Sequence, residues 1–354
     1  MGLKRRKLST KKTKKKLKPR NSLSNLPDEI LHHILSFLKL RDIARLRVLS
    51  KKFQTLSATA PSFCFSERRP SFWFSKPRFR HRRNCSCAHV FNFMNTLPQH
   101  RSHSLKIKRI SFKSFCDKGE HSSLHDHWIN NLFQTFHVEQ LSLNYQLPSI
   151  FTSLPKFQSL KLLKLEMNRV IMVKLPEMKL TSLETLHIMF FATEDPVGEW
   201  VSQSFPALKS LFLSEINVSW LSKKLLDLEI RSSCLEALSI QNCCSLKPVR
   251  IITENLRTLS YVTCPCVRCH HNDDIVDFRY DDSVFEISAP NLRRLSWQGY
   301  APRLCYDART FQSLQVASFT KLSLQNLNLT IQLFEATRRA TSLHTDTGMI
   351  KVSS

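Results

Sequence analysis

Glycine is scarce in this chain, with only five residues among 354. None of the five belongs to a G-x-x-x-x-G-K phosphate-binding loop or to a G-x-G-x-x-G dinucleotide-binding loop. Such loops need glycine at fixed positions, because their backbone must approach phosphate groups closely. The sequence therefore argues against nucleotide chemistry, and we expect no bound cofactor.

Long apolar runs are absent as well. No stretch reaches 18 consecutive apolar residues, and the first residues lack the apolar core of a secretory signal. We therefore expect a soluble protein that has no membrane contact. Its 11 cysteines are expected to be reduced thiols rather than a disulfide framework, and their odd number agrees with that expectation.

Acidic residues are almost missing from the two stretches that carry most of the net charge of +25. Residues 1–20 contain 11 Lys and Arg and no acid, and residues 66–109 contain 11 basic residues and one Glu. From Ile110 onward, 25 basic and 24 acidic side chains nearly cancel. The net charge therefore belongs to the two stretches, and it does not mark the larger C-terminal part as a nucleic-acid-binding region.

The first of these stretches, residues 1–21, has the composition of a disordered basic tail. Two basic clusters a few residues apart are typical of a nuclear import signal, which predicts the nucleus as the location and the cytoplasm as a second compartment. The residues of this predicted signal are Lys4, Arg5, Arg6, Lys7, Lys14, Lys15 and Lys16.

The second basic stretch overlaps a predicted joint, residues 64–104, in which Phe72, Trp73, Phe74 and Phe79 stand among Arg and Lys residues. Aromatic side chains among basic ones can stack on exposed bases. Aromatic residues that follow a small domain more often pack it against the next one. We favour packing, and nucleic acid is the less favoured partner.

The stretch from Leu26 to Phe53 predicts three short helices. Pro27, followed by two carboxylates, is typical of a helix start. Apolar residues then recur at the three-and-four spacing that gathers them on one helix face. About 40 residues are too few to bury that many aliphatic side chains, so this segment is predicted to bind another protein.

The pattern Leu-Pro-x-x-Ile-Leu-x-x-Ile-Leu-x-x-Leu at residues 26–38, followed by Leu-Ser-Lys-Lys-Phe at residues 49–53, resembles an F-box. Phe53 stands where that family usually has Trp. The resemblance implies docking to the Skp-type adaptor of an SCF ubiquitin ligase. It assigns the adaptor-facing surface to Leu26, Pro27, Ile30, Leu31, Ile34, Leu38 and Phe53. The alternative is that these residues only form the core of a helical hairpin.

From Ile107 onward, a repeated unit has apolar residues at its first, fourth and sixth positions, as in Leu183, Leu186 and Ile188. Further units begin at Ile107, Val138, Leu160, Leu208, Leu225, Leu235, Leu256 and Leu292, and a weaker one begins at Leu314. Many starts are 21 to 25 residues apart, the range of leucine-rich repeats, although steps of 31, 17, 10 and 36 also occur. Such units bury their apolar face only by stacking on neighbours, which predicts an irregular solenoid with a parallel sheet.

The residue between the fourth and sixth positions is expected to point outward on the concave face and to contact a bound protein. The candidates are Ser142, Lys164, His187, Phe212, Glu229, Ser239, Ser260 and Ser296. Most of them are small and neutral, so they indicate no substrate class. A solvated outer surface is the simpler interpretation for any one of them.

Cys264, Cys266, Cys269 and His270 are the one cluster with the ligand types of a zinc site. Their tight spacing, without a second distant pair, is unusual for zinc, and we predict a surface loop without a metal. The same residues contain the C-x-x-C-H pattern of covalent haem attachment. That chemistry belongs to export compartments, which this chain shows no sign of entering.

The order of these parts resembles plant F-box/leucine-rich-repeat proteins over residues 22–330. The resemblance implies an α+β multidomain chain, with a small all-helical F-box followed by an irregular α/β leucine-rich-repeat solenoid. The expected parts are a tail (1–21), the F-box (22–63), the joint (64–104), the repeats (105–330) and a polar C-terminal tail (331–354). Many relatives end in a further FBD domain, which we expect to be missing or truncated here.

The resemblance further implies a non-catalytic receptor subunit of an E3 ubiquitin ligase. Its partners would be a Skp-type adaptor, a cullin scaffold reached through that adaptor, and an unidentified protein substrate. Two alternatives remain open at this point: a nuclear nucleic-acid-binding protein that uses the tail and the joint, and a scaffold that uses the repeats alone.

Overall fold

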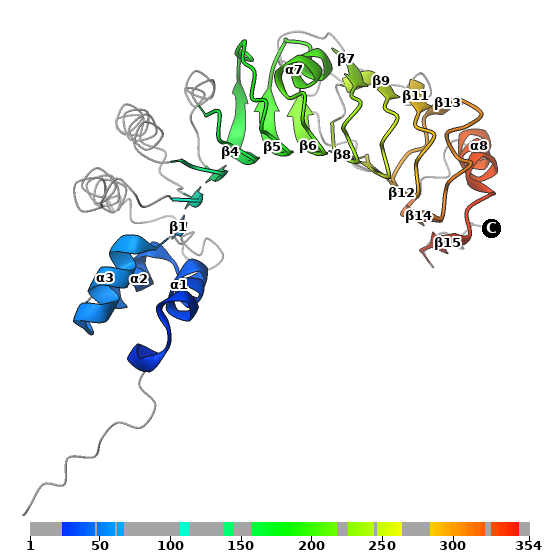
Figure 1. Cartoon of the computed structure of the whole chain (residues 1–354). Coiled ribbons are helices and arrows are strands. Elements are labelled where there is room, and N and C mark those ends of the chain that lie inside the picture. The colour runs from blue at the N-terminus through cyan, green and yellow to red at the C-terminus, as the bar shows by residue number, and fades with distance from the viewer. Residues whose placement is uncertain are drawn as a thin grey trace, which may run out of the picture.

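The computed structural model describes residues 23–46, 48–60, 62–66, 107–113, 137–144, 157–217, 226–243, 246–263, 284–322 and 327–346. These residues form a small helical domain followed by an arched, strand-rich array, with the helices at one end of the arch (Figure 1). None of the helices in this described part combines the length and the apolar character that crossing a bilayer requires.

The helical domain contains a 3-10 turn (Leu23–Asn25) and the helices α1 (Asp28–Phe37), α2 (Leu40–Leu46) and α3 (Lys51–Thr59). As expected, α1 begins directly after Pro27, with Asp28 and Glu29 in its first turn. Ser50 caps α3, because its hydroxyl accepts a hydrogen bond from the backbone N–H of Phe53 at 3.2 Å. The small core of this domain consists of Leu31, Leu35, Ile43, Phe53 and Leu56.

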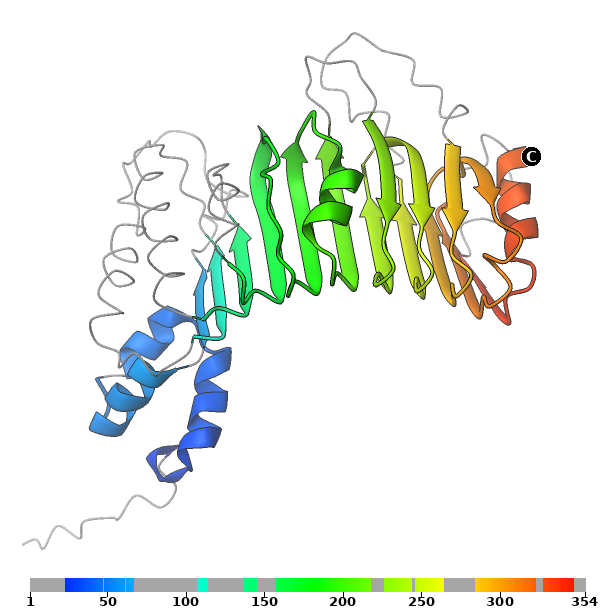
Figure 2. The same cartoon turned by 45° about the horizontal axis from the view of Figure 1, so that its top comes forward.

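Eleven strands form one sheet along the concave side of the arch, and four form a second sheet on the convex side (Figures 1 and 2). The concave sheet contains, in spatial order, β1 (Ser62–Ser66), β2 (Arg109–Lys113), β3 (Gln140–Asn144), β4 (Leu162–Met172), β5 (Thr185–Ala192), β6 (Ser210–Asn217), β8 (Ala237–Gln241), β10 (Thr258–Val262), β12 (Arg294–Gln298), β14 (Val316–Thr320) and β15 (Ser342–Thr345). The convex sheet contains β7 (Leu226–Arg231), β9 (Leu246–Ile252), β11 (Val284–Ser288) and β13 (Arg303–Tyr306). Neighbouring strands are parallel in both sheets.

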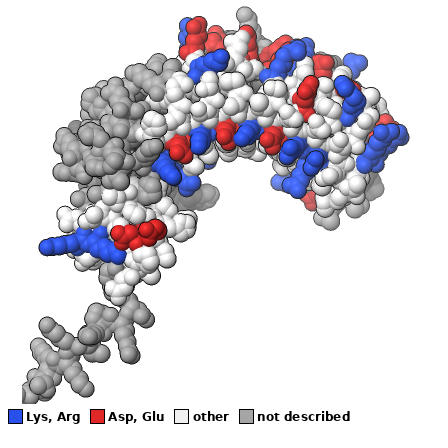
Figure 3. Space-filling view, viewed as in Figure 1, with Lys and Arg blue, Asp and Glu red and all other residues white. Residues whose placement is uncertain are grey.

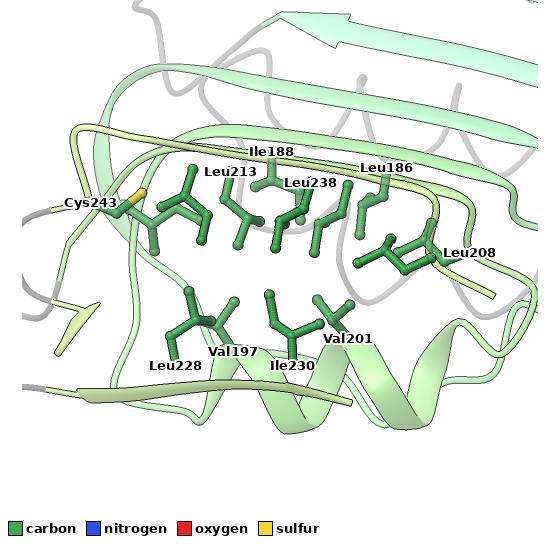
Figure 4. Packing of buried hydrophobic residues seen from close by; sticks show 14 of the residues in the cluster. Leu186, Ile188, Val197, Val201, Leu208, Leu213, Leu228, Ile230, Leu238 and Cys243 are labelled. Carbon is green, nitrogen blue, oxygen red and sulfur yellow. The ribbon is translucent and has the colours of Figure 1, made fainter. Parts of the chain in front are cut away.

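The apolar positions of the repeated unit form the core between the two sheets. The first, fourth and sixth positions of the unit at Leu183 are buried, and the equivalent residues of the neighbouring strands are buried beside them. Figure 4 shows Leu186 and Ile188 of β5 and Leu213 of β6 facing Leu228 and Ile230 of β7. Stacking of one strand on the next therefore buries the face that a single unit would expose.

One predicted unit lies in the other sheet. Leu228 and Ile230 belong to β7 on the convex side, although they fit the same sequence template. Both sheets face one core, so inward-pointing residues of either sheet produce the same pattern. Once this unit is set aside, the steps of 17 and 10 residues merge into one step of 27 between Leu208 and Leu235, close to the other steps in this part of the chain.

Of the helices that the structure describes, α7 (Val197–Ser204) and α8 (Leu327–Thr337) lie on the convex side. Val197 and Val201 of α7 point into the core (Figure 4). Helix α7 approaches β7 closely because Gly198 lies against the backbone of Glu229, where a Cβ atom would overlap the carbonyl group.

The sheet extends beyond the boundaries expected from the sequence at both ends. Strand β1 directly follows α3 and pairs with β2, although we expected the repeats to begin at residue 105. The expected polar tail at 331–354 is wrong for residues 331–346, where α8 ends and β15 pairs with β14. Leu333 and Ala336 of α8 are buried, so this segment contributes apolar packing that its polar composition conceals.

A left-handed backbone conformation recurs five residues after the start of several concave strands. Phe190, Glu215, Asn242 and Lys321 have φ values of 49° to 62° there, and Gly299 has 97°. Gly299 also lies against the side chain of Thr263, whose hydroxyl accepts a hydrogen bond from the backbone N–H of Tyr300 at 2.7 Å. This turn combines a positive φ with a close approach, and both favour glycine.

We predict that Gly299→Ala lowers the free energy of unfolding by about 2 to 3 kcal/mol, because the new methyl group meets Thr263 in a strained conformation. Urea denaturation followed by circular dichroism measures the change. Lys321→Gly, at the equivalent position after β14, is the control and should leave stability unchanged or slightly raised. An unaltered midpoint for Gly299→Ala would contradict the prediction.

Candidate adaptor-docking and recognition surfaces

The helical domain exposes a stripe of large apolar side chains. Ile30, Ile34 and Phe37 follow one another along one face of α1, with fractional exposures of 47%, 37% and 73%. Val48 and Leu49, in the turn between α2 and α3, are 86% and 70% exposed. We call Ile30, Ile34 and Phe37 the exposed stripe. Apolar side chains at this density on so small a domain make the exposed stripe a candidate surface for binding another protein.

The seven residues predicted to face an adaptor fall into three groups. Pro27, Ile30 and Ile34 are exposed. Leu26 and Leu38 are half-buried against the core of the domain.

Leu31 and Phe53 form the third group and need a correction, because they are buried, with exposures of 1% and 8%. Leu31 and Phe53 belong to the core beneath the predicted adaptor-facing surface and are not part of that surface. Two features explain their burial: Leu31 lies about a quarter turn around α1 from the exposed stripe, on the side that packs with Leu35 into the small core, and Phe53 lies in the first turn of α3, next to its serine cap.

Sequence reasoning missed Phe37, Val48 and Leu49. Phe37 follows Ile34 by three residues on the same helix face, so the helical period could have identified it. Val48 and Leu49 lie in a turn, where periodicity gives no prediction.

Seven of the eight predicted recognition residues lie in one straight row across the concave sheet. Strand pairing places them in register as Ser142, Lys164, His187, Phe212, Ser239, Ser260 and Ser296. The row continues through Ser111 and Cys64 on one side and through Ser318 and His344 on the other. We call this set the concave row.

Glu229, the eighth candidate, is on the convex sheet and is not part of the concave row. Its carboxylate takes part in a charged network with Arg250, whose guanidinium lies 3.8 Å from Glu229 and 3.3 Å from Glu286 of β11. The prediction is wrong for this residue because the strand that carries it belongs to the other sheet.

The central part of the concave row combines a cation with two rings. The rings of His187 and Phe212 stack with their centroids 5.3 Å apart. Burial, helped by the neighbouring Lys164 ammonium group, lowers the pKa of His187 below its ordinary value. At neutral pH His187 is therefore an uncharged ring, able both to donate and to accept a hydrogen bond.

A pocket of about 420 Å³ lies where the helical domain meets the first strands of the concave sheet. Its lining includes Ser36 and Phe37 of α1, Cys64 of β1, and Arg109 and Gln140 of β2 and β3. The Arg109 Nε–H group donates a hydrogen bond to the Gln140 side-chain carbonyl at 2.7 Å. The exposed stripe and the concave row thus approach one another at this pocket.

Three predictions from sequence concern residues outside the described ranges. They are the nuclear import signal within residues 1–21, the basic aromatic joint predicted at 64–104, of which only residues 64–66 are described, and the cluster at Cys264, Cys266, Cys269 and His270. Among the residues that the structure does describe, no group of three or more metal-ligating side chains comes together.

Comparison with known protein families identifies the helical domain. Residues 23–65 match the family model of the F-box domain. The matched segment comprises the three helices, with the exposed stripe, and all of strand β1 except its last residue.

Several Arabidopsis thaliana proteins are similar to a larger part of the chain. F-box protein At3g59000 is 28% identical over 62% of the chain and 44% of its own length. FBD-associated F-box protein At1g66310 is 26% identical over 77% of the chain and 51% of its own length. F-box/FBD/LRR-repeat protein At5g56420 is 28% identical over 81% of the chain and 57% of its own length.

The chain thus spans about half the length of the relatives that it matches. It carries an F-box domain at residues 23–65, and most of its length is similar to plant proteins that join an F-box to leucine-rich repeats or are associated with an FBD domain.

Proposed function

We propose that this chain is the substrate-recognition subunit of an SCF-type ubiquitin ligase. In this proposal the F-box binds a Skp-type adaptor, which connects the chain to a cullin scaffold, and the strand array binds the protein that is to be ubiquitinated. The observation that carries the proposal is the exposed stripe on a domain that matches the F-box.

The distribution of exposed apolar side chains supports an adaptor-binding role for the F-box. Among the described residues, the strongly exposed large apolar ones number 11, and six of them lie between Leu23 and Leu49. Leaving them in water loses the free energy that burial would give, about 1.5 to 3 kcal/mol for a fully buried aliphatic side chain. Contact with an apolar surface of the adaptor recovers that free energy.

We infer that the strand array is a leucine-rich-repeat solenoid and that the concave row contacts the target protein. The regular register of β2 to β15 and the similarity to F-box/LRR-repeat proteins support this inference. The chain then acts by positioning: it holds lysines of the target near a ubiquitin-charged enzyme, and the partner proteins supply the chemistry. No nucleophile of this chain is required.

We predict that Ile30→Ser with Ile34→Ser weakens binding of a recombinant Skp-type adaptor about a hundredfold. The two changes remove apolar contacts worth about 3 kcal/mol together, and each 1.4 kcal/mol is a factor of ten. Biolayer interferometry with the full chain measures the dissociation constant. Both residues are exposed, so the thermal unfolding midpoint should change little.

The matched control is Leu327→Ser with Ile331→Ser on α8. These residues have the same spacing and comparable exposures, 57% and 44%, at the opposite end of the array. The control should bind the adaptor like the wild-type chain. If the wild-type chain fails to bind the adaptor, or if both double variants lose binding equally, the receptor function is wrong.

We also propose that the basic clusters of the tail direct the chain to the nucleus. Replacing Lys4, Arg5, Arg6 and Lys7 together with Lys14, Lys15 and Lys16 by Gln removes both clusters. A fluorescent fusion of this variant should move from the nucleus to the cytoplasm in plant cells. A fusion that stays nuclear without these seven charges would rule the signal out.

A further inference from the structure

The edge of the concave sheet at which the strands begin carries a ladder of charges. The residue just before each strand donates its backbone N–H to the carbonyl of the equivalent residue on the preceding strand, so these residues stand side by side. In spatial order they are Lys108, Glu139, Lys161, Glu184, Lys209, Glu236, Arg257 and Arg293. We call this set the rim ladder.

The rim ladder alternates in sign along most of its length. Lys161 lies 3.8 Å from Glu139, Lys209 lies 3.3 Å from Glu184, and Arg257 lies 3.8 Å from Glu236. Figure 3 shows alternating basic and acidic side chains along the concave side of the arch. Each acid in this part is matched by a neighbouring cation, so the rim has little net field here.

The alternation ends at β12. Arg293 follows Arg257 where an acid would continue the series, and Arg294 is the first residue of β12 on the concave face. Arg338 and Arg339 lie in the turn that leads from α8 to β15. The backbone N–H of Ser342, the first residue of β15, donates to the carbonyl of Gln315, and the N–H of Gln315 donates to the carbonyl of Arg293. We call Arg257, Arg293, Arg294, Arg338 and Arg339 the arginine end.

Four of these five arginines are free to bind a ligand. Within the described ranges, no carboxylate lies within ion-pair distance of Arg293, Arg294, Arg338 or Arg339, and all four are exposed. Basic side chains gather at this end of the arch in Figure 3. A guanidinium presents two parallel N–H donors, a geometry that fits carboxylate oxygens.

The concave face beside the arginine end is lined by hydroxyl groups. The concave row places Ser239, Ser260, Ser296 and Ser318 in register on four adjacent strands. Short side chains here let another backbone approach the sheet closely. The three strand spacings from β10 through β12 and β14 to β15 add up to about 14 Å, which is the length of roughly four residues of an extended peptide.

We propose that the arginine end binds an extended, carboxylate-rich segment of the target protein, with Asp or Glu side chains on the arginines and the segment's backbone along the serines. This proposal rests on the proposed substrate-recognition function and adds the chemical class of the target segment. The near-zero net charge of the C-terminal part gives no sign of an acidic target, because it averages over the whole region. The unmatched arginines gather at one end of the rim and are visible only in the structure.

Charge and side-chain type favour an acidic peptide over a nucleic acid. A phosphodiester backbone that continued along the rim would meet Glu236, Glu184 and Glu139. Binding of single strands also relies on bases that stack on aromatic rings. The outward positions of β8, β10, β12, β14 and β15 carry no Phe, Tyr or Trp.

Fluorescence anisotropy with the full chain at physiological salt tests the proposal. The probes are a labelled 12-residue peptide of alternating Glu and Ser, the same peptide with Gln in place of Glu, the Gln peptide with phosphorylated serines, and a 12-nucleotide single strand. The Glu peptide should bind best, and Arg293→Gln with Arg294→Gln should weaken its binding about tenfold, since two exposed charge pairs are lost.

The matched control is Arg303→Gln with Arg309→Gln. It removes the same charge from β13 and the turn after it on the convex side, where Arg309 pairs with Asp307 at 3.1 Å. The control keeps the basic tail, as the test variant does, and should bind the Glu peptide like the wild type. Equal losses in both variants, equal binding of the Gln peptide, or stronger binding of the phosphorylated peptide or the oligonucleotide would each overturn the proposal.

The adaptor is absent from this measurement. A failure here therefore leaves the adaptor-binding result standing, and a chain that binds the acidic peptide but no adaptor would retain this site while losing the receptor function.

Discussion

The fold depends on burial of three apolar side chains per repeated unit between the concave and convex sheets. Leu186 of β5, for example, is shielded because Leu163 and Leu211 stand beside it in register and apolar residues of the convex side cover the same core. No unit can be buried alone, so each strand holds its neighbours in position. The outward side chains take no part in this packing, so a change in one of them need not disturb the core.

The same register creates surfaces that composition cannot reveal. Residues more than 20 positions apart, such as Glu184 and Lys209, become neighbours because the backbone N–H of one bonds to the carbonyl of the other. A nearly neutral region can therefore carry an alternating rim along most of its length and an unmatched group of arginines at one end. Net charge gives only the sum of the charges in the region, whereas the strand register determines which charged side chains become neighbours.

The sequence predicted the rows of core residues and the concave row well, because both follow from a period of two along each strand. It could not assign Leu228 and Glu229 to the correct sheet, since both sheets point apolar residues into one core. The resemblance to an F-box assigned Ile30 and Ile34 to the adaptor-facing surface, but it could not separate them from Leu31. That distinction depends on where α2 and α3 pack against α1, which is a tertiary feature. The arginine end was missed because Arg293 and Arg338 come to the same end of the sheet only through the pairing of β12, β14 and β15.

The F-box and the strand array share structure at their junction, and this bears on how a bound target would be held. Leu40 of α2 belongs to the core of the strand array and not to the core of the helical domain. The Ser62 hydroxyl of β1 donates to the backbone carbonyl of Ser36 at 3.3 Å, and β1 itself is the first strand of the concave sheet. A helical domain fixed in this way cannot pivot on a free linker. In the proposed ligase, the distance from the adaptor to a target on the concave row would then be set by the number of strands between them, and the arginine end would lie at the far limit of that distance.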